Sequence, residues 1–299
     1  MDVSVIIPTY GKPVYLKNAI KSVLSQSNIE LELIIVDDNN PETEARKSTE
    51  ELVRKCCNAD ARVIYLKHDH NKNGAAARNT GFAIARGKYI SLLDSDDEYM
   101  PNRLQKCVEA MEGATTDVAG VYTGCEFRRG GKLYHIEKTV PSGNFLKETL
   151  ACTFKFCTGS NIFIRKSVVD ELCGFDEAFI RHQDYEFLAR VFERGYKLMA
   201  VSEPLVIKNN ENVNLPDVRK MIGVKQQYLE KFKDTISRLD ARSQAYIYHT
   251  QCVLIAEAAL RSGEKKISKE YYSRSQKYSR LTIQEAARKI AFTSLNLLH

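Results

Sequence analysis

Apolar residues in the first 210 positions form short β-branched runs that alternate with stretches of helical spacing. The β-branched runs predict strands at 3–8, 31–36, 62–66 and 89–93. The stretches with helical spacing predict helices at 14–26, 42–57 and 74–86. This alternation is typical of an α/β domain in which helices pack on a largely parallel sheet.

The pattern changes after residue 97. Antiparallel strands are expected at 118–127 and 132–137, joined through Gly130 and Gly131, and another short strand is expected at 161–165. A short helical run at 185–190 follows. The first part of the chain is therefore predicted to be a mixed α/β domain covering residues 1–214.

Beyond residue 216 the strand-like runs end and helical spacing takes over. Helices are predicted at 218–233, 241–262 and 266–280, and Gly263 is expected to end the second. A last segment, 282–298, has Ile283, Ala287, Ile290 and Leu297 on one face. We predict a separate helical region at residues 215–299.

Charge divides the chain at the same place. The net charge is +6, but residues 215–299 hold 16 Lys and Arg against 8 Asp and Glu, while residues 1–214 hold 28 against 30. The basic region has no arginine-rich or aromatic-interleaved pattern, so nucleic acid is not the expected partner. A solvated helix face and an anionic membrane face remain alternatives.

Composition limits the protein class. With 299 residues, 43% of them hydrophobic, the chain can bury a sizeable core, which excludes disordered and collagen-like classes. No apolar run reaches the ~18 residues of a membrane-spanning helix, and no secretory signal is expected at the N-terminus. Eight cysteines at irregular spacing predict reduced, inert thiols, among them Cys152, Cys157 and Cys173, and a cytoplasmic location.

Candidate chemistry follows three predicted strands. The first is followed by Pro8, Thr9 and Tyr10, the second by Asp37 and Asp38, and the fourth by Asp94, Ser95, Asp96 and Asp97. In open α/β sheets the carboxyl ends of the strands meet at one edge, where ligands bind. A tyrosine ring can stack on a base, and clustered carboxylates repel one another unless a cation joins them. Taken singly, Tyr10 fits a packing role and Asp37-Asp38 a helix cap.

The segments 3–10, 34–39, 71–81, 87–97 and 174–184 together resemble, in order and spacing, family 2 glycosyltransferases with the GT-A fold. The resemblance covers about residues 1–205. It implies a mixed, mostly parallel sheet flanked by helices, to which the C-terminal helices predicted above from their spacing are added as an appendage. It also implies inverting transfer of a sugar from a nucleotide-diphosphate donor, with Mn²⁺ or Mg²⁺ as cofactor.

The same resemblance implies roles for individual residues. Asp94 would lie toward the ribose and Asp96 on the metal, with Asp94 and Asp97 as further candidate metal ligands. Asp184 would be the base that takes the acceptor proton, with Asp176 and Glu177 as second choices. The residues around the nucleoside and diphosphate would be Pro8, Thr9, Tyr10, Asp38, Asn71, Arg78, Asp94 and Ser95.

Two departures from the family pattern refine this expectation. Gln183 stands where many members have Glu, which is expected to change acceptor contacts and not to remove the base. The chain has no Trp, and so no Gln-x-x-Arg-Trp element, which points to non-processive transfer. Asp184 could also be a plain helix N-cap.

The expected function is metal-dependent transfer from a UDP-sugar to a surface-glycan or lipid-linked saccharide. A lipid-linked acceptor would give the basic helices a use at the cytoplasmic membrane face, and their apolar faces could also pair subunits in a homo-oligomer. The alternatives are a non-catalytic nucleotide-binding scaffold and a sugar-phosphate nucleotidyltransferase. His68-x-His70 is interpreted as part of a solvated loop, because no third metal ligand follows.

Overall fold

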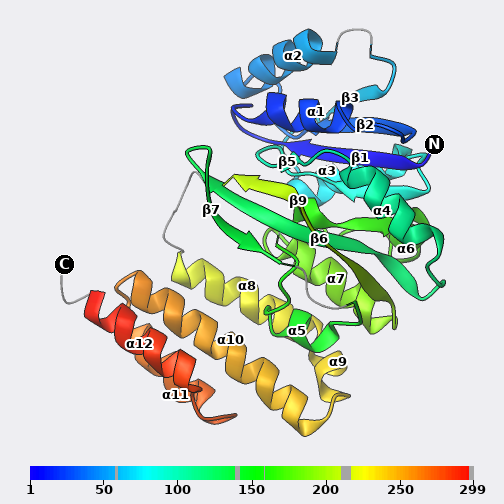
Figure 1. Cartoon of the computed structure of the whole chain (residues 1–299). Helices are drawn as coiled ribbons and strands as arrows, with labels where there is room; N and C mark the ends of the chain where they lie inside the picture. The colour runs from blue at the N-terminus through cyan, green and yellow to red at the C-terminus, as the bar shows by residue number, and fades with distance from the viewer. Residues whose placement is uncertain (58–59, 139–141, 158, 210–216, 296–299) are drawn as a thin grey trace. The chain divides into compact units, whose positions relative to one another are not determined.

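The computed structural model describes residues 1–57, 60–138, 142–157, 159–209 and 217–295 (Figure 1). The chain forms two compact units, one of residues 1–144 with 155–211 and one of residues 145–154 with 212–299. We call them the sheet unit and the helical unit. The predicted boundary at residues 214 and 215 lies outside the described residues.

The sheet unit begins with four parallel strands, β1 (Val3–Thr9), β2 (Leu31–Asp37), β3 (Val63–Lys67) and β4 (Tyr89–Leu92). They lie in the order β3-β2-β1-β4. The connections contain α1 (Leu16–Leu24), α2 (Glu44–Cys57) and α3 (Gly74–Ile84). The predicted α/β alternation is confirmed, with element ends shifted by a few residues.

The rest of the sheet is mixed. From β4 outward the order continues β8 (Phe163–Arg165), β6 (Val118–Arg129), β9 (Lys197–Asn209) and β5 (Glu98–Tyr99), and β7 (Lys132–Glu137) pairs with β6. The predicted antiparallel hairpin of β6 and β7 is confirmed. Strand β9, which runs parallel to β6, was not predicted. Further helices are α4 (Arg103–Glu112), α6 (Lys166–Glu171) and α7 (Gln183–Glu193), with a 3-10 turn at Gly159–Asn161.

Helix α3 approaches the sheet closely because of its small residues. A Cβ added at Gly81 would lie 2.6 Å from the Cγ2 atom of Ile6 in β1, so a larger residue would push the helix outward. The side chain of Asn73 caps the first turn by accepting from the backbone N–H groups of Ala75 and Ala76. The Asn73 backbone N–H donates to Asp38 after β2, and Arg78 donates to Asp94 after β4, so the start of α3 lies near the carboxyl ends of these two strands.

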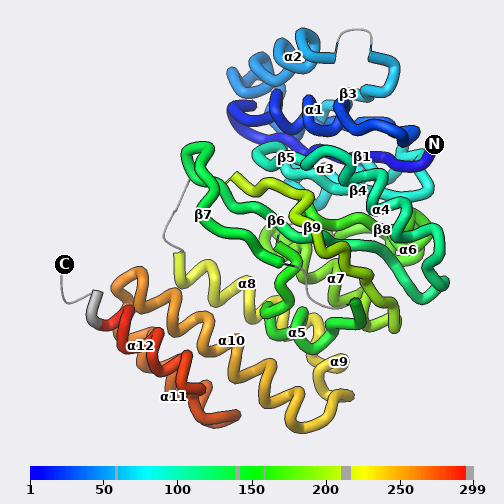
Figure 2. Tube along the Cα trace, viewed as in Figure 1, coloured from blue at the N-terminus to red at the C-terminus, as the bar shows by residue number. Residues whose placement is uncertain are grey.

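The helical unit contains α5 (Leu146–Leu150), α8 (Val218–Lys231), α9 (Lys233–Ser237), α10 (Ala241–Arg261), α11 (Lys265–Ser275) and α12 (Ile283–Leu295) (Figure 2). The predicted helices are confirmed, and Gly263, with φ of +77°, follows α10 as expected. The core includes Val253, Ala256, Ala259 and Tyr272. Among the described residues, no helix is long and apolar enough to cross a membrane.

The predicted apolar face of the last segment points outward. Ile283 is 89% exposed and Ile290 68% exposed, and Ala287 is exposed beside them. Phe292, on another face of α12, packs against the core of the helical unit. Leu297, the fourth predicted member of the face, lies outside the described residues.

The prediction of reduced thiols is wrong for Cys125 and Cys157, which form a disulfide. The pairing of β6 with β8 matches Gly120 to Ile164 and Val121 to Phe163 in antiparallel register. If this register continues beyond the paired residues, the segment before β8 lies next to Cys125 in β6. The 32-residue separation gives no local sequence signal for such a pair. The remaining six cysteines are free, as expected.

Candidate active site

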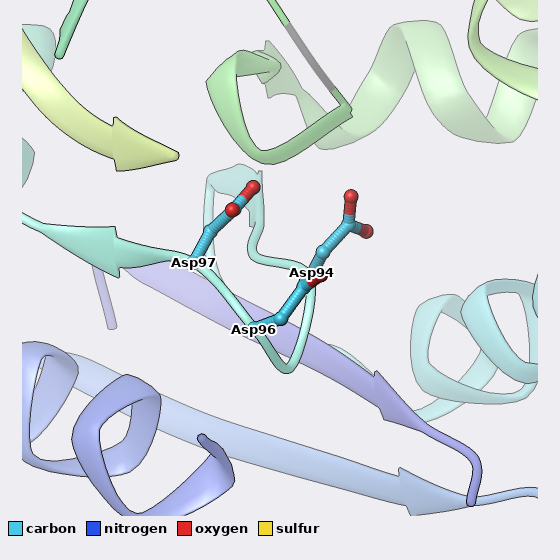
Figure 3. A group of neighbouring side chains, drawn as sticks. All are labelled: Asp94, Asp96 and Asp97. Atoms are coloured by element: carbon cyan, nitrogen blue, oxygen red, sulfur yellow. The ribbon is translucent and has the colours of Figure 1, made fainter. Parts of the chain in front are cut away.

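The loop after β4 carries three of the predicted acidic residues. One carboxylate oxygen from each of Asp94, Asp96 and Asp97 lies within 4.8 Å of the others. The side chains of Asp94 and Asp97 point to the same side of this loop (Figure 3). Ser95 is half-buried in the same loop. The predicted cluster is therefore present as a compact group.

Asp97 differs from its two neighbours because it is fully buried. Its Oδ2 accepts from the Ser160 hydroxyl at 2.6 Å and lies 3.5 Å from the Nζ of Lys208, and its Oδ1 accepts from the Asn209 backbone N–H at 3.2 Å. Burial raises the pKa of Asp97 to about 7, and the charges of Asp94 and Asp96 add to this effect. These contacts anchor the loop to β9.

Asp96 reaches solvent, but the surrounding protein removes much of the water near its carboxylate. This desolvation, together with the charge of Asp94, raises the pKa of Asp96, while Lys208 opposes the shift. Desolvation destabilises the ionised form of this carboxylate, and a bound cation would stabilise that form.

Arg78 joins the loop after β4 to the start of α7. This side chain is 8% exposed, and its guanidinium donates to Asp94 Oδ1 at 2.7 Å and to Gln183 Oε1 at 2.9 Å. Gln183 in turn donates to the Phe179 carbonyl at 2.7 Å. The residue that departs from the family pattern thus accepts a hydrogen bond from the predicted diphosphate-binding arginine.

Asp184 follows Gln183 in the first turn of α7. A Cβ added at Gly159 would lie 2.8 Å from Asp184 Oδ1, so only glycine leaves room for the carboxylate. This buried Oδ1 atom has no hydrogen-bond partner among the described residues. Burial raises the pKa of Asp184, with Arg78 opposing and Asp94 adding to the increase. The arrangement suits a group that accepts a proton.

The second-choice bases have other partners. Asp176 Oδ1 accepts from the Ala178 backbone N–H at 2.9 Å, and Glu177 Oε1 accepts from the Asn79 side chain at 2.9 Å. Both carboxylates stabilise the loop before α7.

Asp38 is buried beneath the segment that precedes α3. Its carboxylate accepts from the side chain of Asn71 and from the backbone N–H groups of Lys72 and Asn73, and Asp38 Oδ1 lies 2.7 Å from His68 Nδ1. These hydrogen bonds join the loop after β2 to the segment before α3. The prediction that His68 lies in a solvated loop is wrong, because its ring is buried between Asp38 and Thr80.

The loop after β1 lies beside this network. Thr9 is buried, and its carbonyl accepts from the Asp38 backbone N–H at 2.9 Å. Pro8 is half-buried, whereas the ring of Tyr10 is 66% exposed. An exposed ring at the carboxyl edge of a sheet is available for stacking on a ligand.

Lys208 is the functional candidate that the sequence analysis missed. It lies on β9, its positive charge faces Asp97, Asp94 and Asp96, and it partly opposes the increase in the pKa of Asp184 that burial causes. Burial by itself would lower the pKa of Lys208, but the three carboxylates raise it overall. Recognition of β9 as a strand ending near the acidic loop would have revealed this lysine.

Comparison with known proteins identifies the family. Residues 4–173 match Glycosyl transferase family 2, and residues 89–282 match Glycosyl transferase family group 2. This chain belongs to glycosyl transferase family 2. The resemblance seen in the sequence motifs is thereby confirmed.

Curated relatives of this glycosyltransferase cover most of its length. An uncharacterized glycosyltransferase of Methanocaldococcus jannaschii is 33% identical over 70% of this chain and 72% of its own. The amylovoran biosynthesis glycosyltransferase AmsB of Erwinia amylovora is 29% identical over 68% and 67%. The UDP-Glc:alpha-D-GlcNAc-diphosphoundecaprenol beta-1,3-glucosyltransferase WfaP of Escherichia coli is 25% identical over 78% and 82%.

Solved structures share the fold of this glycosyltransferase. Residues 1–349 of S. aureus TarS match with a TM-score of 0.62 at 14% identity, over 98% of this chain and 89% of that one. The mannosyltransferase PcManGT of Pyrobaculum calidifontis, in complex with GDP-Man and Mn²⁺, matches with a TM-score of 0.60 at 17% identity, over 99% and 80%. The predicted GT-A fold with C-terminal helices is confirmed.

Proposed function

We propose that this glycosyltransferase moves a sugar from a nucleotide-diphosphate donor, most simply a UDP-sugar, to a saccharide hydroxyl with inversion at the anomeric carbon. The observation that carries the proposal is the Asp94–Arg78–Gln183 connection. The connection links the acidic loop after β4 to the start of α7, where Asp184 Oδ1 is buried and without a partner among the described residues, and this supports a shared site.

The residues of this site fit a divalent cation. Asp94 and Asp96 offer hard oxygen ligands within reach of one another, and desolvation of Asp96 favours an added positive charge. Asp97 fits the role of anchor better than that of ligand, because both its oxygens have protein partners. Mn²⁺ or Mg²⁺ held by Asp94 and Asp96 would supply Lewis-acid neutralisation of the departing diphosphate.

The protein side chains then act on the donor and acceptor. Asp184 Oδ1 takes the proton of the acceptor hydroxyl, whose oxygen forms the bond to the anomeric carbon from the face opposite the diphosphate. The bond from that carbon to the diphosphate oxygen breaks, and its electron pair leaves with the nucleoside diphosphate. Arg78 and Lys208 contribute fixed positive charge at the site of that leaving group.

The donor's nucleoside is assigned to the edge formed by β1 and β2. The exposed ring of Tyr10 would stack on the base, and Pro8 and Thr9 would lie beside the nucleoside at the same edge of the sheet. We assign Asp38 and Asn71 to holding the nucleoside-binding loops in place, because their hydrogen bonds join the loop after β2 to the segment before α3. Ser95 and Asp94 would face the ribose.

Two kinds of support favour a UDP-sugar and a glycan acceptor. Structures of TarS contain UDP or UDP-GlcNAc. The name of AmsB states a role in amylovoran biosynthesis. The name of WfaP states that it transfers glucose from UDP-Glc to a diphosphoundecaprenol-linked sugar. The absence of Trp favours non-processive transfer. We therefore propose a saccharide of a surface glycan, free or lipid-linked, as acceptor.

Three variants test the catalytic assignment. Asp184→Asn is expected to lower turnover by about 10³-fold while UDP affinity, measured by calorimetry, stays within twofold. Asp96→Ala is expected to weaken UDP binding only when Mn²⁺ is present. Asp176→Asn is the matched control and should retain activity. Equal donor turnover by wild type, Asp184→Asn and Asp96→Ala would overturn the catalytic assignment, and UDP binding with no turnover in wild type would favour a non-catalytic scaffold.

We further propose that α12 contacts an anionic membrane surface. Its outward face combines exposed Ile283 and Ile290 with a net basic helical unit, a combination typical of interfacial helices. This contact would bring the enzyme to a lipid-linked acceptor on the cytoplasmic face.

Point substitutions test this contact better than removal of the segment, because Phe292 of α12 packs in the core. Ile283→Ser with Ile290→Ser should reduce co-sedimentation with vesicles containing anionic lipid by at least fivefold. Val14→Ser, at a residue 70% exposed in the sheet unit, is the control. If vesicle co-sedimentation changes neither with the double substitution nor with the salt concentration, the proposed contact is excluded.

A further inference from the structure

Lys225, on α8, is a buried lysine that the proposed reaction does not use. It is 2% exposed, and its Nζ donates to Gln251 Oε1 on α10 at 2.6 Å. The other end of that amide donates to the Leu150 carbonyl at 2.7 Å. No carboxylate of the described residues forms an ion pair with Lys225, and burial lowers its pKa. A buried ammonium with a single neutral partner is costly.

Lys225 lies at a cleft between α8, α10 and α11. The cleft has a volume of about 380 Å³, which is within the usual range for small-ligand sites. Its lining includes three tyrosines, two glutamines and three basic residues, and no Asp or Glu is among the residues that form it. A binding site of this composition favours a ligand that is negatively charged and has polar groups around an apolar ring face.

The walls of the cleft are aromatic and basic. Tyr248 and Tyr278 stack with ring centroids 5.3 Å apart and an interplanar angle of 25°. The Arg274 guanidinium lies 4.9 Å from the centroid of the Tyr271 ring and also pairs with Glu270 at 2.9 Å. Arg274 therefore has a counter-charge of its own, whereas Lys225 has none in the described part of the chain.

We propose that this cleft binds a saccharide carrying a phosphate or carboxylate group, with the Lys225 ammonium at the charged group and the tyrosines against the sugar ring. The anion supplies the counter-charge that Lys225 lacks, in a charge-assisted hydrogen bond. The tyrosine hydroxyls and the Gln226 amide supply donors and acceptors for sugar hydroxyls. The proposal is independent of the reaction assigned above, because the cleft belongs entirely to the helical unit.

Calorimetry on the full chain tests the proposal with four probes: glucose 1-phosphate, glucuronate, glucose and inorganic phosphate. At least one anionic sugar should bind, and at least tenfold more tightly than glucose or inorganic phosphate. The Lys225→Met and Lys225→Gln variants should each weaken that binding by tenfold or more. Lys220→Met, at an exposed lysine of the same helix, should leave it unchanged. The binding should persist in Asp96→Ala, which separates it from the donor site.

The opposite results would overturn the proposal. If neither anionic sugar binds, or if both bind Lys225→Met and Lys225→Gln as tightly as wild type, the cleft is not the site. If inorganic phosphate binds as tightly as glucose 1-phosphate, the sugar does not contribute to binding and the proposed saccharide ligand is wrong. Comparing glucose 1-phosphate with glucuronate then distinguishes a phosphate-bearing from a carboxylate-bearing ligand.

Discussion

The sheet unit and the helical unit bury positive charge in different ways. Arg103 of the sheet unit is fully buried and donates to the side chains of Thr123 at 2.8 Å and Asn161 at 3.2 Å, with the Tyr99 ring centroid 4.7 Å away. Lys225 of the helical unit has one amide oxygen and an adjoining cleft. Neither forms an ion pair among the described residues. The acceptors around a buried cation therefore indicate whether it is structural or available to a ligand.

Among the variants that test this comparison, the largest effect is expected for Arg103→Met. Because the substitution removes the hydrogen bonds that the buried guanidinium donates to Thr123 and Asn161 and its contact with the Tyr99 ring, it should destabilise the fold by about 3 kcal/mol. Thermal unfolding should show a decrease of several degrees, with exposed Arg54→Met as the control. A melting temperature equal to that of wild type would show that Arg103 does not stabilise the fold.

Arg78→Met is expected to come next. Because Arg78 donates to both Asp94 and Gln183, its loss should lower kcat/KM for the donor about 100-fold, with partial recovery in Arg78→Lys. Initial rates over a range of donor concentrations measure the effect. Wild-type rates in Arg78→Met would show that this arginine does not contribute to the reaction.

Lys208→Met should have opposite effects on two ligands. Removing a positive charge that faces three carboxylates should strengthen Mn²⁺ binding about tenfold while donor KM rises by a similar factor. Metal titration followed by calorimetry, and separate donor kinetics, resolve the two effects. Lys197→Met, at a surface ion pair with Asp117, is the control. Weaker Mn²⁺ binding would mean that Lys208 supports the metal site and does not compete with it.

The smallest effect, opposite in sign to that of Arg103→Met, is expected for Lys225→Met. Burial lowers the pKa of Lys225, so the unfolded chain binds its proton more readily and wild-type stability should rise as pH increases toward the ordinary lysine range. Lys225→Met removes this dependence and should stabilise the ligand-free protein at pH 7 by about 1 kcal/mol, with the gain shrinking at higher pH. Denaturant unfolding at several pH values measures the difference. Strong destabilisation at every pH would assign Lys225 to the same structural class as Arg103.

The sequence predicted most of the parallel half of the sheet, because its strands are continuous buried runs with helical spacing between them. It did not reveal β9, in which Ser202, Glu203 and Pro204 interrupt the apolar pattern and the pairing with β6 shifts register. The two apolar runs that remain, Leu198 to Val201 and Leu205 to Ile207, are each too short to stand out.

The candidate site was predictable only where residues lie in local motifs. Asp94, Asp96 and Asp184 follow recognisable runs, so their positions could be proposed from the sequence. Lys208, Ser160 and the Cys125–Cys157 pair depend on contacts between distant segments, and their spacing along the chain carries no signal. The burial of His68 similarly depends on Asp38 and Thr80, which lie on other elements.

The two units are not successive lengths of chain, and this matters for dissecting the protein. The helical unit contains residues 145–154, where the Thr149 carbonyl accepts from the Tyr228 hydroxyl at 3.0 Å and the Leu150 carbonyl from Gln251. A fragment ending at residue 214 would keep that segment and lose every one of these partners, exposing Leu150, which is fully buried in the whole chain. Excision of the C-terminal helices would therefore damage the piece left behind, so the units are better studied by substitution than by truncation.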